Sequence, residues 1–385
     1  MSGNEKPKKR WRRLAGIAFS LVSLAVLTYI TITLISGRSL DMSWLTGIFT
    51  PRAAVEEVGE YHFDVGRDRV FANLGDAVAA AGTLGVQVLD AGGHETLREA
   101  FRMSRPALSE ENGRAIAFDI GGTAVRVFNG KQVIASIEAS GTVVSASINR
   151  NGWFCVSAQE GAALRGVATV YNDRGSPVYK VNLASGYALS AVLSPDNKNL
   201  AVLNLTEDGS RITLYQGLNK QDPDSAFNLN GGLILDMRYL SNGSLLAVST
   251  HSLYILDRTG ASSLLYEYFD KRLGGYAFDE GYLALHLLDY GVGYSGRLVM
   301  LDEKGLAVGE LATDREFISI SFGGGYLAAL RSDGIMFYDK MFQEFPPLGE
   351  PPVMAGVNSI LALGGGAALL TGENSAIVVR IDNAV

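Results

Sequence analysis

The side chains that most often hold metals or act as nucleophiles are few in this chain and widely separated. They are His62, His94, His251, His286 and Cys155. The histidines lie in four different stretches without the close spacing of metal ligands, so they predict no metal site. Cys155 lies in the apolar run WFCVSA with no cationic neighbour to activate its thiol, and a single cysteine excludes an intrachain disulfide. We therefore predict no catalytic group and no cofactor site among these residues.

Acidic residues recur at one position of a repeated pattern. An aspartate ends a short apolar run at Asp90, Asp257, Asp302, Asp339 and Asp382. Aspartate side chains accept hydrogen bonds from backbone amides in turns, so we interpret these residues as caps of a turn that is repeated with the fold. The functional alternative is a ring of carboxylates around one face of the molecule.

One hexapeptide has the letters of a nucleotide-binding motif. Residues 118–123 read FDIGGT, which resembles the first phosphate motif of the sugar-kinase and actin-like ATPase superfamily. The resemblance would imply that Asp119 manages a Mg²⁺ ion and that the Gly121-Gly122 turn lets backbone amides approach a phosphate. In that superfamily the motif opens a domain of strands alternating with long helices, whereas strand-like repeats flank it here. We therefore predict a β-hairpin turn and no kinase chemistry.

The most distinctive candidate for a binding site is a Tyr- and Gly-rich insertion, DYGVGYSG, at residues 289–296. It contains Asp289, Tyr290 and Tyr294. Tyrosine rings on a rim loop are amphipathic and have little conformational entropy to lose, as in known binding loops. A second, acidic loop with Glu207 and Asp208 should lie on the same face. We predict that these five residues contact a partner, and the alternative for the insertion is a longer hairpin turn.

The elements that must position these residues are given by a repeat. Eight apolar runs end in an acidic or amide residue, and their last residues lie 37 to 45 positions apart. The runs are VQVLD (86–90), VRVFN (125–129), ATVYN (168–172), ITLYQ (212–216), LYILD (253–257), LVMLD (298–302), IMFYD (335–339) and VVRID (378–382). A unit of this length, built from strands and tight turns, is typical of a propeller blade.

The repeat predicts an all-β propeller of eight blades, with seven as the alternative because the first and last units are irregular. Turn chemistry supports the hairpins, since SPDN (194–197) and SNGS (241–244) join apolar strands. The glycine triplets at 323–325 and 364–366 are also expected to be turns. The last unit has room for only three strands, and residues 61–65 (YHFDV) could supply the fourth and close the ring.

The N-terminal region predicts a membrane anchor. Leu14 to Ile35 is a stretch of 22 residues without a charge, long enough to cross a bilayer as a helix. Six basic residues precede it, so the positive-inside rule places residues 1–13 in the cytoplasm and the body outside. The stretch exceeds a signal-peptide core, and no small-residue cleavage site follows it. We expect a transmembrane signal anchor at 14–36, a juxtamembrane linker at 37–59 in which Trp44 lies near the lipid interface, and an extracytoplasmic propeller at 60–385.

The charge of the body limits its partners. Residues 1–13 hold six basic residues and one acidic residue, which leaves 27 Lys and Arg against 39 Asp and Glu in the rest of the chain. An acidic body of this kind does not favour nucleic acid, whose phosphates attract Lys and Arg. The predicted partners are the cytoplasmic membrane, through one helix, and an envelope protein or wall polymer.

The layout as a whole resembles an uncharacterised family of single-pass, membrane-anchored, degenerate WD40-like propeller proteins of Gram-positive bacteria. That resemblance implies a fold and a cell-membrane location with the N-terminus in the cytoplasm, and it brings no activity. The sequence therefore favours a non-catalytic scaffold that binds an envelope protein or wall polymer. The alternatives are a carboxylate-dependent enzyme acting on wall glycans or peptides, and an extracytoplasmic sensor.

Overall fold

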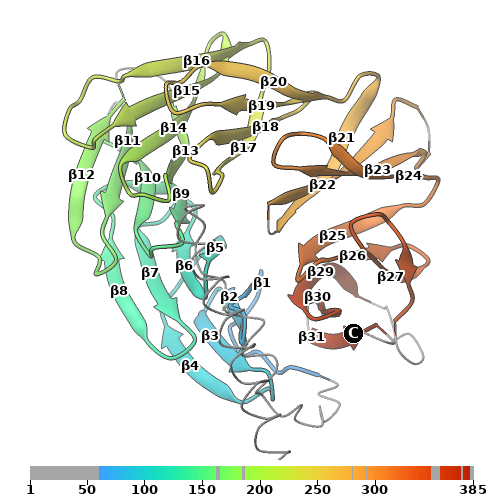
Figure 1. Cartoon of the computed structure of the whole chain (residues 1–385). Coiled ribbons are helices and arrows are strands. Elements are labelled where there is room, and N and C mark those ends of the chain that lie inside the picture. The colour runs from blue at the N-terminus through green and yellow to red at the C-terminus, as the bar shows by residue number, and fades with distance from the viewer. Residues whose placement is uncertain are drawn as a thin grey trace, which may run out of the picture. The chain divides into compact units, whose positions relative to one another are not determined.

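The computed structural model describes residues 60–161, 165–183, 187–279, 281–291, 293–347, 356–373 and 376–381. The chain divides into two compact units, Met1–Glu57 and Val58–Val385, and all described residues belong to the second unit. Their strands form eight antiparallel sheets, seven with four strands and one with three. Each sheet is a meander of consecutive strands, so each is one blade of a propeller, and the predicted eight-bladed fold is confirmed (Figure 1).

The first four blades contain β1 (Val70–Asn73), β2 (Ala77–Gly82), β3 (Gly85–Asp90), β4 (Glu95–Ala100), β5 (Pro106–Glu111), β6 (Arg114–Asp119), β7 (Ala124–Asn129), β8 (Val133–Glu138), β9 (Thr142–Ile148), β10 (Phe154–Glu160), β11 (Arg165–Tyr171), β12 (Pro177–Asn182), β13 (Tyr187–Leu193), β14 (Asn199–Thr206), β15 (Gly209–Gln216) and β16 (Ser225–Asn230). The last four contain β17 (Ile234–Tyr239), β18 (Leu245–Ser249), β19 (Ser252–Leu256), β20 (Ser262–Glu267), β21 (Lys271–Asp279), β22 (Tyr282–Asp289), β23 (Gly296–Asp302), β24 (Ala307–Thr313), β25 (Phe317–Gly323), β26 (Tyr326–Arg331), β27 (Gly334–Tyr338), β28 (Glu344–Phe345), β29 (Val357–Gly364), β30 (Ala367–Gly372) and β31 (Ala376–Arg380).

Burial changes from the inside of each blade to its rim. The second strand of a blade is covered on both sides by neighbouring blades, so all six residues of β2, AVAAAG, are buried. The fourth strand lies at the outer rim, where β4, β8, β12 and β16 are visible in Figure 1. It alternates between exposed and half-buried residues, as in β4, ETLREA. This explains why the second strands are continuous apolar runs and the fourth strands are mixed in sequence.

The core is divided among the seams between blades. Each apolar cluster joins neighbouring sheets, as where Ile116 and Val125 of the second blade pack with Val143 and Phe154 of the third. The cluster that contains Tyr61 joins the first and last blades, because Tyr61 packs with Val78 and Leu369. The cores therefore continue around the ring.

The segment ahead of β1 fastens the two ends of the ring together. On one side, the Tyr61 amide donates to the carbonyl of Ala376 at 2.7 Å, next to a bridge between Glu60 and Ile377 of β31. On the other side, the Asp64 amide donates to Gln87 Oε1 at 2.8 Å. The prediction that residues 61–65 supply a fourth strand is thus confirmed only as a contact with the last blade. Tyr61 is hydrogen-bonded to β31 and Glu60 forms an isolated bridge with it, but residues 61–65 form no strand.

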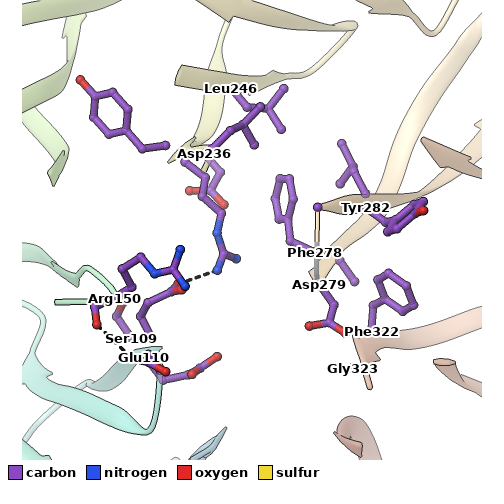
Figure 2. Close-up of a pocket in the computed structure, with 18 of the residues that line it drawn as sticks. Ser109, Glu110, Arg150, Asp236, Leu246, Phe278, Asp279, Tyr282, Phe322 and Gly323 are labelled. Carbon is purple, nitrogen blue, oxygen red and sulfur yellow. Dashed lines mark hydrogen bonds and ion pairs between the residues drawn. The ribbon is translucent and has the colours of Figure 1, made fainter. Parts of the chain in front are cut away.

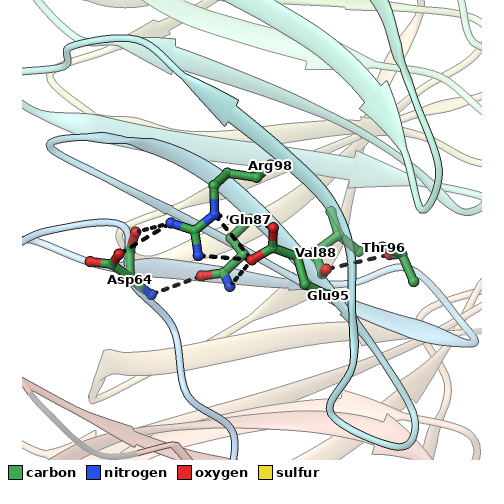
Figure 3. Close-up of polar contacts among 6 residues, drawn as sticks. All are labelled: Asp64, Gln87, Val88, Glu95, Thr96 and Arg98. Atoms are coloured by element: carbon green, nitrogen blue, oxygen red, sulfur yellow. Dashed lines mark hydrogen bonds and ion pairs between the residues drawn. The ribbon is translucent and has the colours of Figure 1, made fainter.

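A polar network completes this fastening on the first blade. Arg98 of β4 forms ion pairs with Asp64 at 3.1 Å and with Glu95 at 2.8 Å. Glu95 also accepts a hydrogen bond of 2.7 Å from Gln87 (Figure 3). Because Gln87 and Arg98 both contact Asp64, the incoming segment is held against two strands of the first blade.

The turns agree with the interpretations made from sequence. Asp90 caps its turn by accepting from the amides of Gly92 and His94, both at 2.9 Å, and Asp302 does the same for Lys304 and Leu306 at 2.9 Å. Asp257 and Asp339 follow the same pattern. The recurrent aspartates are therefore turn caps in the described residues, and Asp382 lies outside them.

The glycine-containing motifs are turns as well. The FDIGGT segment is the turn between β6 and β7, and Asp119 accepts from the amides of Ser104 and Arg105, both at 2.8 Å. The triplets at 323–325 and 364–366 join the first and second strands of the last two blades. A Cβ on Gly324, whose φ is +58°, would lie 2.5 Å from the Cα of Gly364, so these two turns meet at a distance that only glycine allows.

The predicted membrane anchor cannot be compared with the structure, because residues 14–36, including Leu14 and Ile35, lie outside the described residues together with the tail at 1–13 and the linker with Trp44. In the part of the chain that is described, none of the secondary structure is a helix with the length and apolarity needed to cross a bilayer.

Candidate functional site

A cavity of about 1300 Å³ lies at the centre of the ring. The innermost strands of all eight blades contribute to its wall. One lining residue from each is Asn73, Ser109, Ala146, Ser190, Asp236, Tyr276, Ile320 and Ala362. The turns that follow these strands also line it, including Asn112-Gly113 after β5 and Leu240-Ser241 after β17. The cavity therefore opens at the end of the ring where the first turn of each blade lies.

We call this end the cavity face. It holds the turns between the first and second strands and between the third and fourth strands of each blade. The opposite end, which we call the loop face, holds the turns between the second and third strands and the connections between blades. The Glu207-Asp208 turn and the insertion after Asp289 lie on the loop face. The alternating directions of antiparallel strands separate the turns in this way.

Charged side chains from non-adjacent blades meet in the cavity. Figure 2 shows Glu110 and Arg150 on the left with Asp236 above them, and Phe278 and Asp279 to the right. Glu110 comes from β5, Asp236 from β17 and Asp279 from β21. The inner ends of three blades thus bring three carboxylates to one hollow.

An ion pair crosses the cavity. Arg238 Nη2 of the fifth blade lies 2.6 Å from Glu111 Oε2 of the second blade, and the third and fourth blades separate the two in the ring. The Arg238 guanidinium also lies 5.7 Å from the centre of the Phe278 ring, a cation–π contact. Arg238 and Asp236 are two residues apart on β17, so they lie on one side of the strand, while Met237 between them is buried in the seam with the fourth blade.

The cavity changes the acidity of its carboxyl groups. The Glu110 side chain is solvent-accessible, but the solvent around it fills a hollow with protein walls. Desolvation and then the nearby negative charge of Glu111 raise the pKa of Glu110 to about 7, and Arg238 opposes this rise. Because its pKa lies near neutrality, Glu110 exchanges a proton in the physiological range.

Asp236 is affected in the same direction. Burial raises its pKa, against the opposing hydrogen bonds from the amide of Met237 at 2.8 Å and from the Tyr276 hydroxyl at 3.3 Å. Burial and then the charge of Asp236 raise the pKa of Tyr276, which stays a hydrogen-bond donor. Within the described residues, no group of three or more His, Cys, Asp or Glu side chains is placed to hold a metal ion.

The histidines and the cysteine lie away from one another. His62, His94 and His251 are exposed, whereas His286 is buried in β22 with its ring 4.9 Å from that of Phe317. Desolvation lowers the pKa of His286 to about 4, so this ring is neutral at physiological pH. Cys155 is fully buried, and burial raises the pKa of its thiol, as expected for a small core residue.

The residues proposed from sequence for partner contact lie on the other face of the ring. Tyr290 and Tyr294 are 62% and 48% exposed in the turn between β22 and β23. Asp289 forms an ion pair with Lys271, which ties the start of this turn to the innermost strand of its blade. Glu207 and Asp208 are exposed in the two-residue turn between β14 and β15. The structure places all five on the loop face, as expected, and their role stays a prediction.

The loop face also exposes apolar side chains. Of the 13 large apolar side chains that are exposed in the described part of the chain, eight lie in loop-face turns, in connections between blades or at the starts of innermost strands. These eight are Leu84, Tyr187, Leu233, Leu235, Phe269, Tyr290, Tyr294 and Ile318.

The cavity residues were missed from sequence. Glu110, Asp236, Arg238 and Asp279 belong to no motif and are separated by up to 169 positions. The only local signal is a charged residue within an innermost strand of a propeller, as in ILDMRY of β17. The side chain of such a residue points either into the central channel or into a seam between blades. Only in the central channel can its charge stay hydrated.

The fold belongs to a large structural class. The chain is similar to Sqt1 of Saccharomyces cerevisiae, with 13% identity over 85% of this chain and 100% of that one and a TM-score of 0.57. It is similar to the C-terminal WD40 domain of Sif2, with 13% identity over 86% and 98% and a TM-score of 0.55. It is also similar to BamB of Moraxella catarrhalis, with 14% identity over 84% and 99% and a TM-score of 0.53. These likenesses define the class as a WD40-like β-propeller.

The family is defined by sequence. Residues 54–343 match the model of DUF5711, a family of unknown function, and this chain belongs to that family. The search of curated proteins gave no match.

Proposed function

We propose that this protein is a non-catalytic binding scaffold. Its propeller is held outside the cytoplasmic membrane by a helix at residues 14–36 and binds an envelope protein or wall polymer. The observation that carries the proposal is the central cavity, where side chains of the second, fifth and sixth blades converge on one open hollow. A rigid ring with a shaped hollow on one face is suited to recognition, because little ordering of the protein is needed on binding.

The location rests on the sequence. The uncharged stretch of 22 residues and the six basic residues ahead of it support an anchor with the N-terminus in the cytoplasm. Protease added to intact protoplasts should then digest the propeller and leave a small N-terminal fragment. Protection of a fragment the size of the propeller would contradict this topology.

Binding at the cavity can be tested by crosslinking from defined positions. A photoreactive phenylalanine at Ser241, which lines the cavity, should crosslink a partner in native membranes. The same group at Leu264, which is 53% exposed on the outer strand β20, is the matched control. The Ser241 product should be lost when Glu110→Gln and Asp236→Asn are combined. Equal products from both positions, or a Ser241 product that survives the double substitution, would contradict a partner site in the cavity.

The exposed rings of the loop face are proposed as a second contact surface. Tyr290 and Tyr294 project from a turn that contains glycines, and Gly291 and Gly293 have open space around the positions of their missing side chains. The turn can therefore present both rings to a partner.

A carboxylate-dependent enzyme acting on wall glycans is the second candidate. The observation that favours it is Glu110, whose pKa of about 7 suits a general acid, in the same hollow as Asp236 and Asp279. Incubation of the purified protein with wall glycan should then release new reducing ends, and Glu110→Gln should abolish the release. We expect no release from the wild type.

A further inference from the structure

The lining of the cavity carries an excess of negative charge. It holds six carboxylates and two guanidinium groups. They belong to Glu110, Glu111, Asp236, Asp279, Asp302 and Glu303, and to Arg150 and Arg238. Low-dielectric walls around such a hollow concentrate its field and attract ligands of the opposite charge.

The cavity already accommodates one cationic side chain of the protein itself. The Arg238 guanidinium pairs with Glu111 at 2.6 Å and packs on the Phe278 ring at 5.7 Å from its centre. Carboxylate on one side and an aromatic ring on another is the arrangement that binds guanidinium and ammonium groups in general. Arg238 therefore shows directly that the chemistry of these walls fits a cation.

We infer that the cavity binds a basic peptide segment of the partner, whose Arg or Lys side chains enter between Glu110 and Asp236 on one side and the Phe278 ring on the other. The inference rests on the proposed scaffold function and names the chemistry of its partner. The volume of about 1300 Å³ is enough for several side chains, so the ligand is a segment of chain and not a single ion.

The raised pKa of Glu110 supports binding of a basic segment. Desolvation and then the negative charge of Glu111 on the same strand raise the pKa of Glu110 to about 7; the positive charge of Arg238 of β17 opposes this rise, and Asp279 of β21 adds to it. A bound cation would favour the ionised form of Glu110 and release its proton. Binding should therefore strengthen as the pH rises through neutrality.

The experiment measures binding of an acetylated hexa-arginine amide to the full chain in a neutral detergent by titration calorimetry. Hexa-glutamate is the control peptide. The isosteric pair Glu110→Gln, Asp236→Asn should weaken hexa-arginine binding by about tenfold or more, as expected for the loss of charge-assisted hydrogen bonds. The matched control is the double substitution Glu267→Gln, Asp314→Asn, which also removes two carboxylates. Glu267 is exposed at the end of the rim strand β20, and Asp314 is exposed in the connection between β24 and β25. That control should bind like the wild type.

A second variant should change the affinity for hexa-arginine in the opposite direction. Arg238→Met removes the internal cation and should strengthen hexa-arginine binding, whereas a loss of affinity for hexa-arginine would contradict the inference. In the wild type the affinity should rise between about pH 6 and about pH 8, and this rise should be smaller in Glu110→Gln. The melting temperature of each variant shows whether it is folded.

The outcomes separate this inference from the scaffold function. Equal weakening in the cavity variant and the Glu267/Asp314 control, or preference for hexa-glutamate, would overturn the basic-segment inference. If the Ser241 crosslink still depends on Glu110 and Asp236 while hexa-arginine does not bind, the scaffold proposal stands and the inference is wrong. If both fail, both are wrong.

Discussion

The two faces of the propeller differ in the chemistry that they expose. The cavity face gathers carboxylates, two arginines and the Phe278 ring around a hollow. The loop face exposes eight large apolar side chains, among them Tyr290 and Tyr294 in the sixth blade. The cavity residues come from the innermost strands and the cavity-face turns, whereas the exposed apolar side chains lie at the starts of innermost strands, in connections between blades and in turns between second and third strands.

This difference follows from the construction of a blade. An innermost strand starts on the loop face and ends on the cavity face, so one short segment supplies both chemistries. In β17 the exposed Leu235 lies near the start, and Asp236 and Arg238 follow toward the cavity. One rigid ring can therefore present a polar hollow to one ligand and an apolar surface to another, without any change in its core.

The largest expected effect concerns the closure on which both faces depend. Tyr61 is 5% exposed in the seam between the first and last blades, so Tyr61→Ala should lower the free energy of unfolding by about 3–5 kcal/mol. Chemical denaturation measures this, and His62→Ala at the exposed neighbouring position is the control. If Tyr61→Ala unfolds like the wild type, the segment ahead of β1 does not close the ring.

A pair of glycine substitutions compares the two faces directly. Gly324→Ala on the cavity face places a Cβ 2.5 Å from the Cα of Gly364 at a φ of +58°, and should cost about 2 kcal/mol or more. Gly291→Ala on the loop face meets no atom within 4 Å and should be nearly neutral. Equal melting temperatures for the two variants would show that the turns of the last two blades do not meet as described.

A smaller effect depends on pH and on the cavity face alone. The pKa of Glu110 is raised from 4.5 to about 7, so between these values the folded protein holds a proton that the unfolded chain has lost. The Glu110 contribution to stability therefore falls as the pH rises through this range, and it stays unfavourable above it. Glu110→Gln should melt above the wild type at about pH 8 and close to it at about pH 5. Glu267→Gln is the control, and the same gain in that variant would exclude a specific effect of the cavity.

The smallest expected change in stability is on the loop face. The double substitution Tyr290→Ala, Tyr294→Ala should alter the free energy of unfolding by no more than about 0.5 kcal/mol, because both rings are exposed. If the loop face contacts the partner, the same change should lower partner recovery from crosslinked membranes, as expected for hot-spot residues that contribute about 2 kcal/mol. A large drop in melting temperature would show instead that the tyrosines belong to the core. Unchanged recovery of the partner would show that the turn is only a long hairpin turn.

Much of the fold could be predicted from the sequence. The eight repeats predicted eight blades, and the polar residues between apolar runs predicted the turns, including those capped by Asp90 and Asp302. These features depend on residues within a few positions of one another, where strand alternation and turn chemistry act locally. The position of the closing segment was predicted correctly but its secondary structure was not, because Tyr61 contacts β31 while residues 61–65 form no strand.

Of the candidate binding surfaces, one could be predicted from the sequence and the other could not. The exposed turn with Tyr290 and Tyr294 is a local insertion, so its position on the loop face could be predicted from the repeat alone. The residues of the cavity could not be predicted in this way, because Glu111 and Arg238, for example, lie 127 positions apart and meet only when the ring is closed. The sequence by itself determined the repeat, the number of blades and the turn that departs from it. The tertiary structure alone decided which charged residues face one another, because the closed ring brings the inner ends of distant blades to a common hollow, where desolvation and mutual repulsion change their acidity.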